Sequence, residues 1–373
     1  MRNLRKSLLP AIFVGTLIII ALVTFFGPYR KYSDNEKRML AEFPELTWKT
    51  VSSGQFQKEL EVYISDHLTG RDFFVGVDAY FSKAMGKNAL NSIYHADGGY
   101  LINAPKGNPE GHFEKNMNYI ESFGAFAGGK ATMIIVPSSG YIMEERLPAF
   151  HKKYGDGEFF ETAKKLTSSV EFLDVREDFK KLHKENKELY YRTDHHLTAG
   201  GSYEMYKKYC SLKGLTAPGK KDYNIGKFGG FYGTTYSGSG YWLTEADTLE
   251  VWDLGEKVKV TFDEGEKVTD TMFFKEHLEN KDKYPIYLDG NHGYVKIENP
   301  KAEGGNLLVI RDSFGQSLAP FLAHNYKNIY LLDMRYYRKS VKTLFAKEKI
   351  DEVLFLFGLD TLLTDSSTAW LLI

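Results

Sequence analysis

The stretch that decides the fold is residues 306–322, NLLVIRDSFGQSLAPFL. Residues 307–310 form a short apolar run, which is typical of a parallel strand buried on both faces. The next three residues, Arg311-Asp312-Ser313, predict a sharp turn before a helix. A serine at such a junction presents its hydroxyl at the open edge of the sheet, where the helix N-terminus stabilises negative charge. Ser313 is therefore our candidate nucleophile.

A serine hydroxyl needs a base within hydrogen-bond reach, and the base needs an acceptor that orients it. Residues 190–196, YYRTDHH, offer both on one short loop. Side chains at i and i+2 of an extended or turning backbone project to the same side. Asp194 can then hold one nitrogen of His196 while the other nitrogen faces Ser313. His195 points the other way, and we expect it to have a supporting role.

The rest of the pattern alternates strands with helices, which predicts an α/β fold with a doubly wound parallel sheet and active residues at the C-terminal ends of its strands. Residues 217–300 differ, because they are rich in Gly, Tyr, Ser and Thr and then in short alternating strands. We expect them to form an antiparallel β-rich insertion, with a flap near residues 223–241. The expected strands are 131–136, 170–175, 307–310, 329–332 and 353–357, and the expected helices include 111–126, 161–168, 199–212 and 340–345.

Composition excludes several classes of protein. The 373 residues carry 48 basic and 49 acidic side chains, so the net charge of −1 gives no electrostatic basis for binding nucleic acid. A hydrophobic share of 43% excludes a disordered chain. The single cysteine, Cys210, excludes an intramolecular disulfide and a multi-cysteine zinc site.

Residues 8–26, LLPAIFVGTLIIIALVTFF, carry no charge and are long enough to span a bilayer. Arg2, Arg5 and Lys6 precede them, which favours an N-terminus on the inner side. A cleaved signal peptide is the alternative. The long apolar run and the absence of an A-x-A site favour an uncleaved anchor. We therefore expect a membrane anchor at residues 1–30 and a single extracytoplasmic domain at residues 31–373. The anchor would hold the protein at the cell membrane.

Three motifs carry a family resemblance. TDHH at residues 193–196, RDSF at 311–314 and DMRYY at 333–337 together resemble the DHHW protein family, which is related to the alginate O-acetyltransferases of the SGNH hydrolase superfamily. The resemblance implies an SGNH-hydrolase-like fold, with Asp194, His196 and Ser313 matching the family's D-x-H motif and its late serine. Leu197 stands where the family name expects tryptophan, which puts the shape of the site in doubt more than the triad.

The function that the resemblance implies is transfer or removal of acyl groups on cell-surface or exopolysaccharide, by a serine O-acetyltransferase or acetylesterase. Acetyl-CoA is not available outside the membrane, so a membrane-bound O-acyltransferase is the expected acyl donor. No cofactor is expected. Transfer and hydrolysis remain open, as do the sugar and the oligomeric state.

Two further residues are candidates for binding the substrate or the oxyanion, beside the backbone N–H that follows Ser313. Arg335 follows the next strand, where its guanidinium could grip a carboxylate or an acetyl oxygen; a structural salt bridge with Asp312 or Asp333 is the alternative. Asn291 could offer its amide, and an ordinary turn is the alternative there.

We also weighed a metal site at Asp194, His195, His196 and Asp312. Adjacent histidines rarely point at one ion, and no further metal-ligand spacing supports such a site. No metal is therefore predicted.

A second function stays open on the sequence alone. The glycine- and tyrosine-rich residues 228–241 suit a non-catalytic glycan-binding or scaffolding protein of a polysaccharide-modification system.

Overall fold

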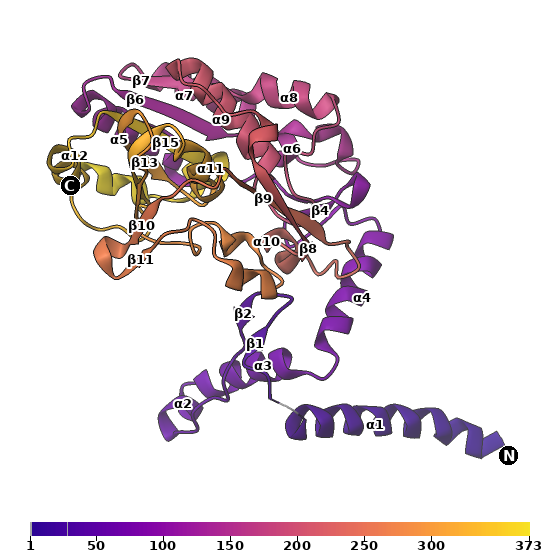
Figure 1. The fold of residues 1–373 in the computed structure, drawn as a ribbon. Helices are drawn as coiled ribbons and strands as arrows, with labels where there is room; N and C mark the ends of the chain where they lie inside the picture. Colours follow the sequence, from indigo (N-terminus) through magenta and orange to yellow (C-terminus); the bar gives the residue numbers. More distant parts are fainter. Residues whose placement is uncertain (1, 28) are drawn as a thin grey trace. The chain divides into compact units, whose positions relative to one another are not determined.

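A computed structural model describes residues 2–27 and 29–373 (Figure 1). The chain forms two compact units. The N-terminal unit comprises Met1–Asn91 and Tyr236–Thr244, and the sheet unit comprises Ser92–Thr235 and Glu245–Ile373. The predicted division into an anchor at residues 1–30, a domain at 31–373 and an insertion at about 217–300 stays a prediction.

The N-terminal unit begins with α1 (Arg2–Phe26). Its segment Leu8–Phe26 has a mean hydropathy of 2.6 and no buried share, so it is long and apolar enough to cross a membrane; a signal sequence has the same properties. The unit continues with β1 (Tyr32–Ser33), β2 (Arg38–Met39), α2 (Trp48–Ser52), α3 (Gln55–His67), α4 (Arg71–Ala84) and β3 (Ala89–Leu90).

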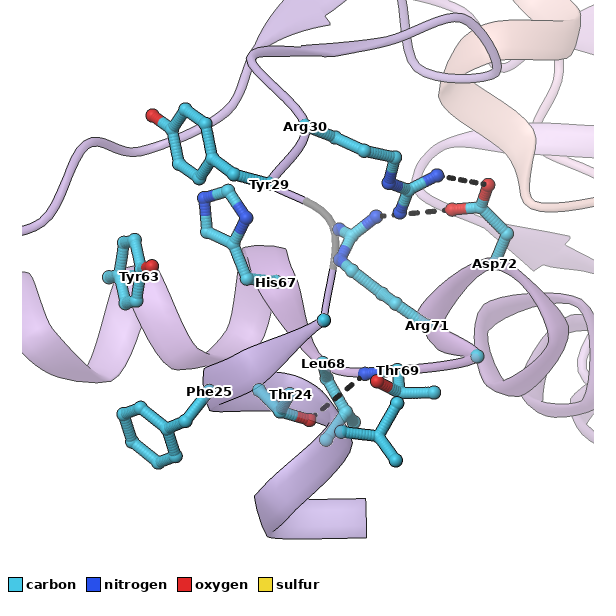
Figure 2. Close-up of a pocket in the computed structure, with 13 residues that line it drawn as sticks. Thr24, Phe25, Tyr29, Arg30, Tyr63, His67, Leu68, Thr69, Arg71 and Asp72 are labelled. Carbon is cyan, nitrogen blue, oxygen red and sulfur yellow. Dashed lines mark hydrogen bonds and ion pairs between the residues drawn. The ribbon is translucent and has the colours of Figure 1, made fainter.

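His67 at the end of α3 is held by its neighbours (Figure 2). Its Nε2 lies 2.8 Å from the carbonyl oxygen of Ala41. Its ring stacks on Tyr29 at a centroid distance of 4.9 Å and lies 4.4 Å from the ring of Tyr63. Ring contacts and one hydrogen bond to the backbone explain the position of this imidazole, so no bound ligand is needed to explain it.

The sheet unit is built on a mixed eight-stranded sheet in the order β11-β10-β12-β14-β13-β15-β6-β7. The five strands from β14 to β7 run parallel, as the alternating pattern predicts. The other three are antiparallel and extend the sheet beyond β14. In the order of the sheet, the strands are β11 (Lys267–Thr269), β10 (Lys259–Phe262), β12 (Tyr294–Glu298), β14 (Tyr326–Leu332), β13 (Gly304–Arg311), β15 (Glu352–Gly358), β6 (Ala131–Val136) and β7 (Val170–Leu173).

Alternate residues of the central strands enter two different apolar cores, one on each face of the sheet. Leu307 and Val309 of β13 pack in one core, and Leu308 and Ile310 pack in the other. The first core includes residues from α8 (Arg176–Lys184), α9 (Ala199–Lys213) and α11 (Phe314–Leu322). The second includes residues from α5 (His112–Phe126), α7 (Asp156–Leu166), α12 (Val341–Lys347) and α13 (Leu359–Thr364).

Local signals predict several of these bounds. Thr198 accepts a hydrogen bond from the backbone N–H of Gly201, and Gly214 ends α9 at a φ of 66°, as expected of an N-cap and a C-cap. On either side of Asp194, Tyr190 and Leu197 form an isolated antiparallel bridge.

The region around 217–300 is antiparallel, as expected, but it divides between two sheets. β8 (Asn224–Phe231) pairs with β9 (Asp247–Asp253) in a separate sheet. β10, β11 and β12 instead join the main sheet. The remaining strands and α-helices are short: β4 (Ile93–His95), β5 (Leu101–Asn103), α6 (Ser139–Ile142) and α10 (Thr234–Ser239).

Candidate functional site

Ser313 lies where the central strand β13 ends and α11 begins. Strand β13 is flanked on both sides by parallel neighbours, so its C-terminal end is fixed within the sheet. Arg311 closes the strand, and Phe314 opens the helix. The predicted strand, turn and helix at residues 306–322 are confirmed, and the serine hydroxyl stands at the sheet edge that the sequence indicates.

The loop that carries Asp194 and His196 meets this edge. The Nε2 atom of His196 lies 2.7 Å from the hydroxyl oxygen of Ser313. Its Nδ1 lies 2.5 Å from Oδ1 of Asp194, which also accepts the backbone N–H of His196 at 2.8 Å. An imidazole that donates from Nδ1 to the carboxylate has its Nε2 lone pair free to accept from the serine. The structure brings these three side chains into one hydrogen-bonded chain across 117 residues of sequence.

The second oxygen of Asp194 is held from the other side. Oδ2 accepts the backbone N–H of Thr234 at 2.6 Å and its hydroxyl at 3.0 Å. Gly233 leaves room for this approach, because a Cβ there would lie 2.2 Å from Oδ2 of Asp194. The carboxylate, 2% exposed, therefore has four donors. Buried carboxylates need such partners to offset the loss of hydration.

Asp247 fixes the backbone just before Asp194. Its carboxylate accepts the backbone N–H groups of Arg192 at 3.0 Å and Thr193 at 2.8 Å, and the Thr193 hydroxyl at 2.5 Å. Burial raises the pKa of Asp247, while these bonds act in the opposite direction. The first residue of β9 thus anchors the loop that bears the candidate base.

Tyr284 covers the imidazole. Its ring stacks on that of His196 at a centroid distance of 3.9 Å and an angle of 13°. Its hydroxyl donates to the carbonyl oxygen of Ser313 at 3.1 Å and to the Ser317 hydroxyl at 3.2 Å. Burial raises the pKa of Tyr284 well above its usual value, so the phenol remains protonated. One side chain therefore positions both His196 and the turn at Ser313.

The predicted oxyanion donor, the backbone N–H that follows Ser313, already has a partner within the protein. The backbone N–H of Phe314, which follows the serine, donates to Oδ1 of Asp312 at 3.0 Å and is not free. Within the described chain, the backbone N–H of Ser313 itself has no such bond. Asp312 is fixed further by the backbone N–H of Gly358 at 2.8 Å and the Thr361 hydroxyl at 2.7 Å. Ser313 therefore supplies both the hydroxyl and the free N–H.

Asn291, the second candidate donor, is oriented by the first turn of α11. Gln316 donates from Nε2 to Oδ1 of Asn291 at 2.7 Å. Because its oxygen is engaged as acceptor, the amide nitrogen of Asn291 is left as a donor. Gln316 is 2% exposed, while Asn291 is exposed to solvent. The same loop is held by Arg311, whose Nη2 donates to the carbonyl oxygen of His292 at 3.4 Å.

Arg335 forms the salt bridge that was the alternative to a substrate contact. Its Nε donates to Oδ1 of Asp333 at 2.9 Å and its Nη2 to Oδ2 at 2.6 Å. The fully buried Arg311 lies 3.6 Å from the same carboxylate. Asp333 is thus the shared counter-ion of two guanidinium groups. The side chain of Arg335 is 29% exposed.

The ligand atoms of Asp194, His195 and His196 lie within 4.8 Å of one another, a spacing that a metal ion could bridge. The same atoms are already engaged, however. Both ring nitrogens of His196 have partners in the chain described above, and Nδ1 of His195 lies 2.9 Å from the hydroxyl of Thr234. The donor set fits the hydrogen-bonded chain better than an ion. The prediction of no metal stays a prediction.

A small cavity of about 40 Å³ lies beside His195 and Phe314. Asp360 and Ser138 are among its other lining residues. Burial raises the pKa of the Asp360 carboxyl to about 6. The cavity has the size of a few atoms, far below the volumes typical of whole-ligand sites.

Four supporting residues were missed by sequence reasoning: Gly233, Thr234, Asp247 and Tyr284. All lie in the region around 217–300, which was expected to form a flap and an insertion. No local spacing links them to Asp194 or Ser313, so only long-range folding shows the connection. The Asp312 contact did have a local signal, since an aspartate often accepts the backbone N–H two residues later.

A protein-family model matches the part of the chain that contains Asp194, His196 and Ser313. Residues 165–332 match the model of the DHHW protein family. A DHHW family protein from Eubacterium siraeum has a similar structure, with a TM-score of 0.65 and 20% identity over 75% of this chain and 95% of that chain. No curated protein matches the sequence.

Two structures of Bacillus cereus PatB1 are also similar. One has a TM-score of 0.61 and 20% identity, covering 74% of this chain and 98% of that chain. The other, solved with a sulfonyl adduct, has a TM-score of 0.62 and 20% identity, covering 74% and 97%. At this level of identity the likeness establishes the fold. The resemblance to the DHHW family is thus confirmed, by residues 165–332 in sequence and by about three quarters of the chain in structure.

Proposed function

We propose that this protein is a serine O-acetyltransferase or acetylesterase that acts on cell-surface or exopolysaccharide, with Ser313 as nucleophile, His196 as base and Asp194 as the group that orients the base. The observation that carries the proposal is the unbroken chain of bonds from Asp194 through His196 to Ser313, at 2.5 and 2.7 Å. We include the finer assignment of the fold, an SGNH-hydrolase-like doubly wound sheet, in the proposal.

The first half-reaction acylates the serine. Ser313 Oγ attacks the carbonyl carbon of an acetyl ester while its proton passes to Nε2 of His196. The backbone N–H of Ser313 and the amide of Asn291 stabilise the oxyanion of the tetrahedral intermediate. The intermediate then expels the donor's oxygen, which takes the proton from His196, and acetyl-Ser313 remains.

The second half-reaction releases the acetyl group. A sugar hydroxyl, or water in the case of an esterase, attacks acetyl-Ser313 and gives its proton to Nε2 of His196. Collapse of the second intermediate forms the new ester or free acetate, and the proton returns to Ser313 Oγ. Asp194 stabilises the imidazolium in both halves. Transfer requires an acyl donor outside the cytoplasm, so we include a membrane-bound O-acyltransferase partner in the proposal.

Two observations support a short acyl group and a polysaccharide acceptor. The cavity beside His195 and Phe314 measures about 40 Å³, which suits acetyl better than a long acyl chain. A larger groove of about 760 Å³ runs alongside residues 188–192, which lead into Asp194. Its lining includes Trp252, with Lys220 4.8 Å from the centroid of the indole ring, and Lys227. Aromatic and hydrogen-bonding side chains are what a glycan surface needs.

The groove also favours the second candidate, a glycan-binding scaffold without turnover. The two proposals differ in what Ser313 does. If the protein were a scaffold, the Ser313→Ala substitution would leave glycan binding unchanged, and the wild-type protein would never form a covalent intermediate.

The deciding experiment follows acetyl release from a chromogenic acetyl ester and labelling by an aromatic sulfonyl fluoride, read by intact mass. A sulfonyl adduct is known for the PatB1 structure, and sulfonylation is a reaction of nucleophilic side chains. We expect wild-type protein to turn over the ester and to gain one sulfonyl group, and Ser313→Ala to do neither. The matched control is Ser122→Ala, because Ser122 lies on α5 with its hydroxyl bonded to Asn118. Full turnover by folded Ser313→Ala would end the enzymatic proposal.

A further inference from the structure

One face of α4 is apolar and open. Phe73, Val77, Phe81 and Met85 recur at intervals of four residues along the helix and its C-cap. They are exposed by 69%, 49%, 64% and 69%, values far above those of core residues. Phe74, at 47%, extends the same face. We call these five residues the α4 stripe.

The α4 stripe is broad and free of charge. At 100° of rotation per residue, its members cover an arc of about 120° around the helix. Ala84 is the other residue within that arc, and Asp78 lies only at its edge. An arc of this width is what a helix normally turns toward a core or a membrane.

The opposite face of α4 already has its partner within the N-terminal unit. Gly76 lies so close to Trp242 that a Cβ there would be 3.0 Å from the indole. Ala79 is fully buried, and a Cβ at Gly240 would lie 3.3 Å from its methyl group. The helix is therefore docked through one face, and the α4 stripe is a second apolar face beyond what docking requires.

We propose that the α4 stripe is a membrane-contacting surface, lying in the interface of the bilayer whose core α1 enters. Two observations, together with a general property of interfacial helices, favour lipid over an aqueous protein partner. The same compact unit contains α1, the apolar helix with a mean hydropathy of 2.6. The stripe is apolar throughout, whereas non-obligate protein interfaces are only slightly more than half non-polar. Interfacial helices bury such a face about 5–10 Å deep at the boundary of headgroups and acyl chains.

The consequence is a two-point attachment. α1 would anchor the chain by its length, and the α4 stripe would hold the N-terminal unit flat on the lipid surface. Attachment through α4 would persist if α1 acted as a cleaved signal. The inference rests on the predicted membrane anchor at residues 1–30 and on the location outside the cytoplasm that the proposed function requires, but not on the catalytic triad.

The test uses the full chain in nanodiscs of phosphatidylcholine and phosphatidylglycerol, with a nitroxide at Phe73→Cys or Phe81→Cys. The native thiol does not compete, because Cys210 is 1% exposed and burial raises its pKa to about 11. The matched control is Val268→Cys, an exposed apolar position on a strand of the sheet unit, 55% exposed. Collision rates with oxygen and with a water-soluble nickel chelate report depth in the bilayer.

We expect labels at 73 and 81 to show several-fold higher oxygen and several-fold lower nickel collision rates than the label at 268. A label at Asp78→Cys should give an intermediate value. Equal nickel accessibility at 73, 81 and 268 would overturn the proposal. Low accessibility to both reagents, with spin–spin broadening between chains, would also overturn it and indicate self-association through the stripe. If a variant at 73 or 81 does not fold, Val77→Cys and Met85→Cys provide the same readout.

The outcome is separable from the fate of the proposed function. Ser313→Ala protein should give the same depth profile as wild type, because the α4 stripe and Ser313 belong to different units. If the protein were inactive but its labels at 73 and 81 lay in the bilayer, the α4 stripe would still be a membrane-contacting surface. An active enzyme with water-exposed labels would refute it.

Discussion

Gly233→Ala tests the way Asp194 is held. The added Cβ would lie 2.1 Å from the Cβ of Asp194 and 2.2 Å from its Oδ2, whereas ordinary contact begins at 3.4 Å. The carboxylate must therefore move by about 1.2 Å, the difference between 3.4 and 2.2. That displacement is enough to break the bonds from Thr234 and to lengthen the bond from His196. The backbone at Gly233 does not have a positive φ, so alanine itself causes no backbone strain there.

The expected loss is about 100-fold in kcat. A misplacement of roughly 1 Å in a catalytic arrangement costs on the order of 10²-fold, equivalent to about 2.7 kcal/mol of transition-state stabilisation. KM for a small ester should change little, because Asp194 orients the base and makes no proposed contact with the substrate.

The assay is steady-state hydrolysis of a chromogenic acetyl ester, accompanied by thermal unfolding of each protein. The matched control is Gly229→Ala in the same strand region, where a Cβ meets nothing within 4 Å. We expect wild-type turnover from the control. If Gly233→Ala retained kcat within about twofold of wild type, the 1.2 Å displacement would be without effect, and the role of Asp194 in orienting His196 would be refuted.

Three further predictions concern neighbouring residues. Gln316→Leu removes the donor that orients Asn291, so kcat for an acetyl ester should fall about tenfold. Combining it with Asn291→Ala should lower kcat little further, because both changes remove the same oxyanion contact. Additive losses in the double variant would show that the two residues do not act together. Tyr284→Phe keeps the ring on His196 but loses the bonds to Ser313 and Ser317, so urea unfolding should show a loss of about 1 kcal/mol; an unchanged midpoint would contradict this. Burial raises the pKa of Asp360 to about 6, so its ionisation opposes folding as the pH rises from about 4 to about 6. The free energy of unfolding of Asp360→Asn should therefore rise relative to that of wild type over that interval, by at most about 3 kcal/mol at pH 7. A difference between the two proteins that did not change with pH would refute the raised pKa of Asp360.

Local patterns in the sequence predict the part of the site that is carried by single segments. Residues 131–136 are apolar apart from Thr132 and form β6 over the same bounds. The junction at Ser313 follows from an apolar run, a polar turn and a helix-forming segment. Asp194 and His196 lie on one side of their loop because they are two residues apart. In each case the information lies within a few residues.

The supports of the site could not be predicted in this way. Tyr284 stacks on His196 from 88 positions away, and Thr234 reaches Asp194 from 40 positions away. Neither has a neighbour in sequence that indicates a contact. The glycine-rich composition around Gly233 predicted a flap, and it gave no sign that the missing Cβ of Gly233 allows the close approach of Asp194. Amino-acid composition shows which residue types a segment contains, but it does not show which distant residues they contact in the fold.

The number of hydrogen bonds at Asp194 bears on the choice between an enzyme and a scaffold. A buried carboxylate loses its hydration, and four donors at 2.5 to 3.0 Å are arranged to offset that cost. A scaffold could fill the same space with apolar side chains and avoid the desolvation penalty altogether. The polar arrangement gives something that stability does not require, namely an imidazole fixed in one orientation with its Nε2 2.7 Å from Ser313 Oγ. Such an orientation is useful only if a proton moves between those two atoms, and for that reason we favour turnover over binding alone.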